Sequence, residues 1–247
     1  MKSTSVSISR SDNHKKNLVI IPGISTLLYP TIWKLLSPSY FSYYAKYFTV
    51  NIVTFNNLPQ NCDMQFIVDQ YNKRLEQLAP YAVIAIEEGA FIAQHVAIQN
   101  PQLFKKLVLV STTAKLCKKT KEIFDHWILC AQQDRWQSLH KSMSMLFSNK
   151  KSPIKYTFFK TPPNPQKLIL LLQVFKDHDS RSLLKNINSE TLVIGGDQNS
   201  LISQIEYLEL MKLIPRAEIL NVDDGCHHVY HQKKHTLENN ILHFILR

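Results

Sequence analysis

The sequence predicts an α/β protein built on a mostly parallel sheet, and two observations favour this fold class. Short apolar runs rich in β-branched residues alternate along the chain with longer segments of helical periodicity, a pattern typical of βαβ units. These runs are almost continuously hydrophobic, as expected of strands that helices cover on both faces. The 247 residues, 45% of them hydrophobic, suffice for one large domain with a substantial core.

Six strands and four helices are expected in the regular part of the chain. The strands cover Asn17–Ile21, Val50–Phe55, Ala82–Ile86, Leu107–Val110, Thr191–Ile194 and Glu218–Val222. The helices between and after them cover Cys62–Leu78, Ala90–Asn100, Ser203–Leu213 and His231–Leu246. In the last helix, Leu237, Ile241 and Ile245 recur at helical spacing, so this face would pack on the sheet.

The middle of the chain interrupts this alternation. Residues 115–149 have a helical pattern, the proline-rich link Thr161–Pro165 follows, and residues 167–176 resume a helical pattern. We therefore expect a helical cap inserted between two strands of the core. The predicted organisation is a disordered polar tail at residues 1–16, a core at 17–114 and 186–247, and the cap at 115–185.

The net charge of +10 is concentrated on the predicted cap. Residues 114–186 contain fourteen Lys and Arg against five Asp and Glu, a net charge of +9, which leaves +1 for the remainder. Such a surface attracts anions and steers acidic partners, so an acidic protein partner at the cap is one interpretation. A solvated helical face decorated with lysines is the alternative, and composition does not separate the two.

Several classes of function find no support in the sequence. No run of 18 apolar residues occurs, so no transmembrane span is expected. No nucleic-acid recognition motif accompanies the basic charge, and no phosphate-binding loop, metal-ligand spacing or cofactor motif is found. The four cysteines lack CxxC spacing, which favours reduced thiols and a cytoplasmic location.

The chain contains only five glycines, and each follows a predicted strand directly or after about one helical turn. They are Gly23, Gly89, Gly195, Gly196 and Gly225. A chain this poor in glycine is expected to keep it where backbone geometry demands it. The carboxyl ends of these strands are therefore the predicted location of a site.

The segment from Ala82 to Thr113 (AVIAIEEGAFIAQHVAIQNPQLFKKLVLVSTT) resembles the α/β-hydrolase superfamily, and the resemblance extends over residues 15–247. It is similar to the family's strand, nucleophile elbow, helix and next strand, where a G-x-S-x-G turn presents the nucleophile. In this chain Ala85 replaces the first glycine and Glu87 replaces the serine. The resemblance thus implies the family's fold without its usual nucleophile.

The other triad positions of the family are also altered. Asn199 stands where the resemblance implies an aspartate, and Asp197, two residues earlier, would serve only if the loop were remodelled. His228 occupies the place of the catalytic histidine. Without its acid, His228 would form a structural pair with Glu87.

The resemblance also implies two backbone donors of an oxyanion hole. Pro22-Gly23 replaces the family's His-Gly, so Gly23 precedes the first donor, the N–H of Ile24, and Glu88 would supply the second. We expect both N–H groups to bind the carboxylate of Glu87, which would fill the site from within. Trp127, in the predicted cap, is a candidate to line a pocket for a small-molecule or acyl ligand between core and cap.

Three functions remain open from the sequence. The first is a non-catalytic pseudo-hydrolase that binds a small molecule or an acidic partner. The second is a hydrolase or lyase of altered chemistry, with Glu87 and His228 as an acid–base pair or Glu87 as a covalent nucleophile. The third is an ordinary carboxylesterase-type hydrolase, for which the alignment at Glu87 would be misread. Hydroxyls that could act as a relocated nucleophile are Ser25, Thr26, Ser111, Thr112 and Thr113, although none of them occupies the elbow.

Overall fold

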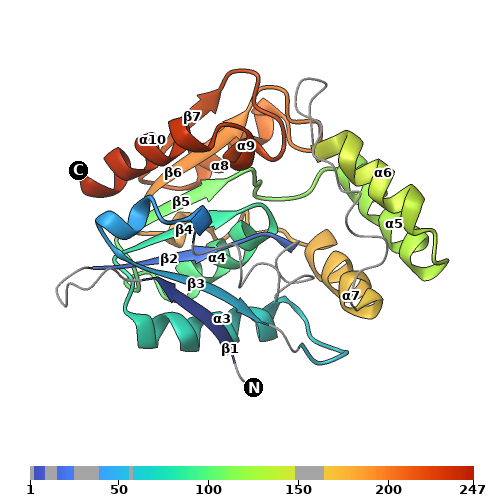
Figure 1. The fold of residues 1–247 in the computed structure, drawn as a ribbon, viewed down its shortest axis with the longest axis horizontal. Helices are drawn as coiled ribbons and strands as arrows, with labels where there is room; N and C mark the ends of the chain where they lie inside the picture. The colour runs from blue at the N-terminus through green and yellow to red at the C-terminus, as the bar shows by residue number, and fades with distance from the viewer. Residues whose placement is uncertain (1–2, 9–15, 25–38, 56–57, 148–163) are drawn as a thin grey trace.

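The computed structural model describes residues 3–8, 16–24, 39–55, 58–147 and 164–247. These residues form a seven-stranded sheet of order β1-β3-β2-β4-β5-β6-β7, shown in Figure 1. Every neighbouring pair is parallel except β1 and β3, which confirms the predicted fold class. The strands are β1 (Ser3–Ile8), β2 (Asn17–Ile21), β3 (Thr49–Phe55), β4 (Ala82–Ile86), β5 (Lys106–Val110), β6 (Glu190–Gly196) and β7 (Ala217–Val222).

Strand β1 corrects the prediction of a disordered tail over residues 1–16. Ser3–Ile8 pairs antiparallel with β3 at the edge of the sheet, from Ser3 opposite Phe55 to Ile8 opposite Val50. Polarity is no obstacle to a strand in this position, because an antiparallel edge strand can leave one face in water. The alternating Val6 and Ile8, among small hydroxyl residues, also suit a strand.

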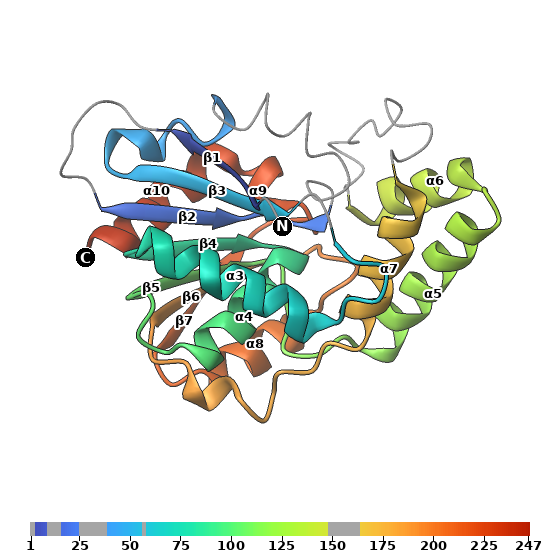
Figure 2. The same cartoon turned by 90° about the horizontal axis from the view of Figure 1, so that it is seen from below.

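Helices cover both faces of the sheet, which explains why the strands are hydrophobic throughout. Figure 2 shows one layer of helices on each side. Along β2, Val19 and Ile21 belong to one buried cluster, whereas Leu18 and Ile20 belong to the other. The helices are α3 (Met64–Leu78), α4 (Glu88–Gln99) and α8 (Gln204–Leu213) on the first face, and the 3-10 helix η1 (Tyr44–Lys46), α9 (Val229–Gln232) and α10 (Lys234–Leu246) on the second.

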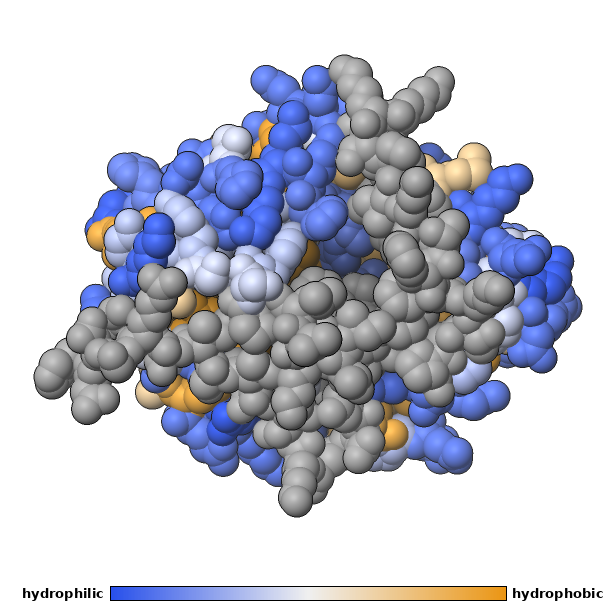
Figure 3. Space-filling model, viewed as in Figure 1, coloured by the Kyte–Doolittle hydropathy of each residue, from blue (hydrophilic) through white to orange (hydrophobic). Residues whose placement is uncertain are grey.

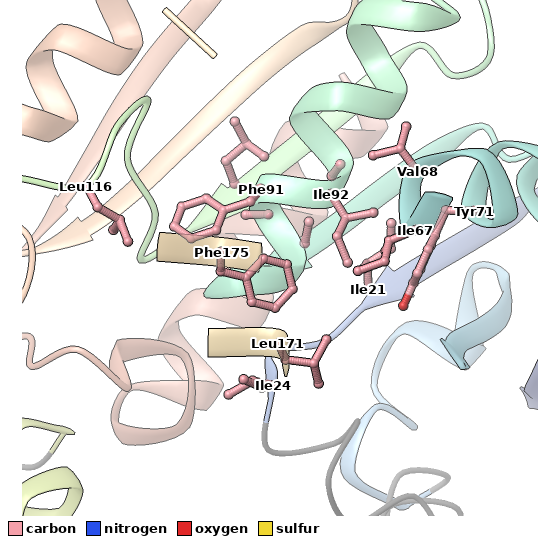
Figure 4. Packing of buried hydrophobic residues seen from close by; sticks show 14 of the residues in the cluster. Ile21, Ile24, Ile67, Val68, Tyr71, Phe91, Ile92, Leu116, Leu171 and Phe175 are labelled. Carbon is pink, nitrogen blue, oxygen red and sulfur yellow. The ribbon is translucent and has the colours of Figure 1, made fainter. Parts of the chain in front are cut away.

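In the described part of the segment between β5 and β6, three α-helices gather beyond the carboxyl ends of the strands in both ribbon views, and the 3-10 helix η3 (Leu184–Asn186) leads into β6. We call residues 115–185 the insertion. Phe175 of its third α-helix packs against Phe91 of α4, with ring centroids 6.0 Å apart, and Leu171 lies beside Ile24 in Figure 4, so this helix continues the core. The helices are α5 (Lys118–Gln132), α6 (Trp136–Phe147) and α7 (Pro165–Lys176).

The helical pattern predicted over residues 115–149 is divided between two helices, because the chain turns between α5 and α6. Asp134 has a φ of 54°, in the left-handed region, and the N–H of Arg135 donates to the carbonyl of Cys130 at 2.8 Å. This is the Schellman arrangement that ends a helix, with aspartate in place of the usual glycine. The predicted helix at His231–Leu246 is likewise divided, since Lys233 departs from helical geometry between α9 and α10.

The helices of the insertion have a polar surface. Hydrophilic side chains predominate over α5 and α6 in the space-filling view of Figure 3. Within the described ranges, no helix combines the length and the apolar character that crossing a membrane requires.

Candidate functional site

The backbone at Glu87 makes the sharp strand-to-helix turn that the sequence predicted. Glu87 has a φ of 54° and a ψ of −126°, lies between β4 and α4, and donates its N–H to the carbonyl of Val110 at 2.8 Å. Such angles cost a non-glycine residue roughly 1–3 kcal/mol, so the surrounding structure must hold them in place. A Cβ on Gly89 would lie 2.4 Å from the carbonyl oxygen of Pro22, because α4 begins against the end of β2.

This turn directs the side chain of Glu87 toward His228, which follows β7. The Nδ1 atom of His228 lies 2.8 Å from Oε1 of Glu87, and the two side chains are 14% and 9% exposed. Burial alone would raise the pKa of Glu87, but the imidazoles of His228 and His227 outweigh it and lower that pKa. The predicted pair of Glu87 and His228 is therefore present, as a buried interaction.

The oxyanion-hole position is filled, but by a different carboxyl from the one expected. The N–H of Ile24 donates to Oε2 of Glu88 at 3.1 Å, and the carboxyl of Glu88 also accepts a hydrogen bond from its own backbone N–H. The expectation that both donors bind Glu87 is thus wrong. The reason is geometric: the strained φ of Glu87 turns its side chain to His228 and leaves the next carboxyl over the donors.

Glu88 has an unusual environment for a carboxyl group. It is 6% exposed, and burial, with the neighbouring charge of Glu87, raises its pKa to about 7. The hydrogen bonds from Ile24 and from its own N–H oppose this shift without cancelling it. Near neutral pH, Glu88 therefore passes between a neutral acid and a carboxylate inside the oxyanion-hole position.

Asn199 contacts the neighbouring histidine, His227. Its Oδ1 accepts the N–H groups of Leu201 and Ile202 at 2.9 and 3.1 Å, which fixes the orientation of the amide. The Nδ2 group then donates to Nδ1 of His227 at 3.2 Å and to the hydroxyl of Tyr207 at 2.5 Å. Nδ1 of His227 must therefore be unprotonated, the opposite of the tautomer that a carboxylate at this position would favour.

His227, which directly precedes His228, is also a member of this site. It is 4% exposed, and burial lowers its pKa to about 4, so it is neutral under ordinary conditions. Its carbonyl accepts the hydroxyl of Ser111 at 2.6 Å, which ties the end of β5 to the loop after β7. Both histidines after β7 therefore contact the site, His228 through Glu87 and His227 through Asn199.

The remaining candidate residues have different positions. Gly23 lies beside Glu87, since a Cβ there would come within 2.5 Å of Oε2 of Glu87. Trp127 is 1% exposed, stacks on Phe124 and donates its N–H to Ser142 at 2.9 Å, so it packs inside the insertion. Among the candidate hydroxyls, Ser25 and Thr26 lie outside the described residues, and Thr112 and Thr113 are buried.

Two pockets lie along α7, at the boundary between the insertion and the core, and neither includes Glu87 or His228. One, of about 520 Å³, runs between α7 and the segment after β3, and the other, of about 450 Å³, runs between α7 and the start of α3. In the part of the chain that the structure describes, no group of three His, Cys, Asp or Glu residues is arranged to hold a metal ion.

Comparisons with known proteins agree with the fold. The chain superimposes on an α/β-hydrolase enzyme from a Medee basin deep-sea metagenome library with a TM-score of 0.87, at 19% identity over 99% of this chain and 94% of that one. It superimposes on the enol-lactonase of Burkholderia xenovorans with a TM-score of 0.85, at 12% identity over 99% and 96% of the two chains. An esterase from Exiguobacterium antarcticum gives 0.76, at 14% identity over 99% and 96%. The protein therefore has the α/β-hydrolase fold.

At the level of sequence the similarity is weaker. No family model matches the chain. A pimeloyl-[acyl-carrier protein] methyl ester esterase from Wigglesworthia glossinidia brevipalpis is 25% identical over 148 residues. That match covers 55% of this chain and only 56% of the esterase.

Proposed function

We propose that this protein is a non-catalytic member of the α/β-hydrolase fold, whose altered site no longer performs acyl transfer. The observation that carries this proposal is the carboxyl of Glu88 on the N–H of Ile24, at 3.1 Å. An ester hydrolase stabilises the oxyanion of its intermediate with such donors. Here an internal carboxyl uses them, and its negative charge would repel the oxyanion.

The other residues that acyl transfer would require are also replaced. Glu87 replaces the serine nucleophile and holds His228 at 2.8 Å, in the place where the base would meet a hydroxyl. Asn199 donates to His227, at the position where the mechanism needs a carboxylate that accepts from a histidine. Replacing that acid by its amide in the serine triad lowers kcat by about 10⁴. Each change removes a separate step, so no single substitution would restore the reaction.

The test is covalent labelling with a fluorophosphonate, together with hydrolysis of short p-nitrophenyl esters. The proposal predicts no labelled residue and no hydrolysis above that of protein denatured under the same conditions. An adduct on a serine of the folded protein would overturn it. That result would favour an esterase, the activity named for the Wigglesworthia relative.

A second candidate is acid–base chemistry on a substrate without acyl transfer. The observation that favours it is a pair of adjacent buried carboxyls with opposite pKa shifts, lowered for Glu87 and raised to about 7 for Glu88. Environments that push two such pKa values apart are typical of acid–base pairs. A Glu87→Gln variant that binds a ligand unchanged but loses its turnover would establish this chemistry. Unchanged ligand binding with no turnover in either protein would support the non-catalytic function.

The retained function would be the binding of a small molecule between core and insertion, or of an acidic partner on the insertion. Some of the basic charge of the insertion is neutralised locally, as in the pairs of Lys176 with Asp125 at 2.7 Å and Lys115 with Asp179 at 3.4 Å. Lys118 is 92% exposed and its pair with Glu122 is long, at 3.9 Å, so its ammonium group can still meet a partner. Partner binding should therefore weaken as salt rises, and binding insensitive to salt would exclude electrostatic recognition.

A further inference from the structure

The strand β7 forms one margin of the sheet, and its outer edge is apolar. No strand of the described residues pairs with that edge, and Figure 1 shows β7 and β1 at opposite sides of the sheet. The other margin is different, because β1 (STSVSI) consists mostly of hydroxyl side chains. In β7 (AEILNV) the side chains of Ile219, Leu220 and Val222 are all half-buried. An apolar edge strand is a template for pairing with another chain, and most proteins protect such an edge.

The backbone of β7 presents three residues to the outside. The carbonyl groups of Arg216 and Val222 accept hydrogen bonds from β6 and from the residue after it, at 2.9 and 3.2 Å. Successive residues of a strand direct their N–H and C=O groups to opposite sides, toward one neighbour and then toward the other. Ala217, Ile219 and Asn221 therefore direct both of their backbone groups away from β6.

The charges at the two ends of β7 favour an antiparallel partner of the same sequence. Arg216 directly precedes the strand, and its side chain is 59% exposed although it pairs with Glu190 at 2.9 Å. Asp223 and Asp224 directly follow the strand and are exposed. An antiparallel second copy brings Arg216 of each chain beside the acidic residues of the other chain. A parallel copy would instead place like charges side by side, which is destabilising.

The helix α8, beside this edge, also exposes apolar side chains. It packs against both β6 and β7, and its Ile205 and Leu208 are 78% and 41% exposed. A two-fold axis perpendicular to the sheet would place the two copies of α8 on the same face of the joined sheet, close to the axis. Apolar area of this kind adds to the hydrogen bonds that two strand edges form, as a lasting homodimer requires.

We propose that the protein forms a symmetric homodimer in which the β7 strands of two copies pair antiparallel and join their sheets into one. Ile219 is the middle of the three outward residues, so the two-fold axis passes between Ile219 of the two copies. Asn221 of each copy then pairs with Ala217 of the other, and every outward N–H and C=O group of the three residues is used. The contact includes neither Glu87 nor His228, so the proposal does not rest on the function proposed above.

Sedimentation equilibrium of the full chain over a range of concentrations tests the dimer, with Asn221→Pro and Asn221→Ala as matched variants. Asn221 is exposed and its N–H points outward, so proline removes a donor from the contact without breaking the ladder to β6. Alanine keeps that donor. We expect Asn221→Ala to dimerise like the unchanged protein, and Asn221→Pro to raise the dissociation constant by about 10-fold or more, since each copy loses one hydrogen bond. An unchanged protein that stays monomeric, or a dimer that proline leaves as tight, overturns the proposal.

A cysteine at the axis gives an independent measurement that does not depend on the proline variant. Ile219→Cys places two thiols across the axis, where the Cα atoms of a hydrogen-bonded antiparallel pair lie about 5.5 Å apart, within the range of a disulfide. Under mild oxidation this variant should form a covalent dimer. Tyr47→Cys, at a position 45% exposed and just before β3, should form little, and the unchanged protein gives the background from the native cysteines. Equal cross-linking at the two positions would overturn the proposed contact.

Discussion

Replacing Glu88 by glutamine should raise the free energy of unfolding relative to that of the unchanged protein. This gain should be larger at high pH than at low pH. Glutamine keeps the acceptor for the N–H of Ile24, so the hydrogen bond at 3.1 Å is retained. It removes the group whose ionisation inside the fold is unfavourable. The perturbation therefore isolates the electrostatic cost of a carboxylate in the oxyanion-hole position.

The magnitude follows from linkage between proton binding and folding. The pKa of Glu88 is about 7 in the folded protein and about 4.5 in the unfolded chain. Well below pH 4.5 both states hold the proton and the group has no effect on stability. As pH rises from 4.5 through 7, the unfolded chain ionises first, so stability falls. A difference of about 2.5 pKa units corresponds to about 3 kcal/mol, lost in full by pH 9.

Urea unfolding at pH 5 and pH 9 measures this effect. Because the unfolded carboxyl is already mostly ionised at pH 5, we expect the free energy of unfolding of Glu88→Gln, relative to the unchanged protein, to rise by about 2.5 kcal/mol between the two pH values. The control is Glu122→Gln, whose side chain is 65% exposed and lies 3.9 Å from Lys118, so its effect should stay within about 0.5 kcal/mol at both pH values. A Glu88→Gln effect that is the same at pH 5 and pH 9 would refute the reasoning.

Three further predictions concern the contact of Asn199 with His227, the close packing at Gly89 and the helix end at Asp134. Asn199→Asp puts a carboxylate beside Nδ1 of His227 and should raise the pKa of that histidine from about 4, as NMR titration would detect; an unchanged value would contradict the contact. Gly89→Ala forces a Cβ to within 2.4 Å of a carbonyl and should destabilise the protein by about 1–3 kcal/mol in urea unfolding, so a neutral effect would count against the turn. Asp134→Gly removes the strain of a φ of 54° and should raise the free energy of unfolding by about 1 kcal/mol in urea unfolding. A lower free energy of unfolding would contradict the left-handed helix end described at Asp134.

The fold was predictable because each of the six predicted strands is a short apolar run between segments of helical or turn pattern. The strands predicted at Asn17–Ile21 and Ala82–Ile86 match β2 and β4 residue for residue, and the other four differ by one or two residues at their ends. Strand β1 was not predictable from its apolar content, because an edge strand needs little of it. The break at Asp134 was hidden for a different reason, since aspartate in the left-handed region gives a weaker signal than glycine.

The site was predicted in its positions but not in its pairings. The turn at Glu87 and its contact with His228 follow from the resemblance and from the direction in which parallel strands end. Which of two adjacent carboxyls would meet the N–H of Ile24 depended on backbone angles at Glu87 that no pattern encodes. The glycines are required for close packing and not for a left-handed backbone. None has a positive φ, and at Gly23 and Gly89 other atoms approach too closely to leave room for a Cβ.

The proposed loss of acyl transfer depends most on the position of the Glu88 carboxyl, and the amide proton of Ile24 reports on that position directly. In a ¹⁵N-labelled sample titrated from pH 5 to pH 9, the Ile24 resonance should shift with a midpoint near pH 7, as its acceptor ionises. The same titration in Glu88→Gln should leave that resonance unmoved. An Ile24 resonance that does not shift in the unchanged protein, or that shifts equally in the variant, would contradict the account.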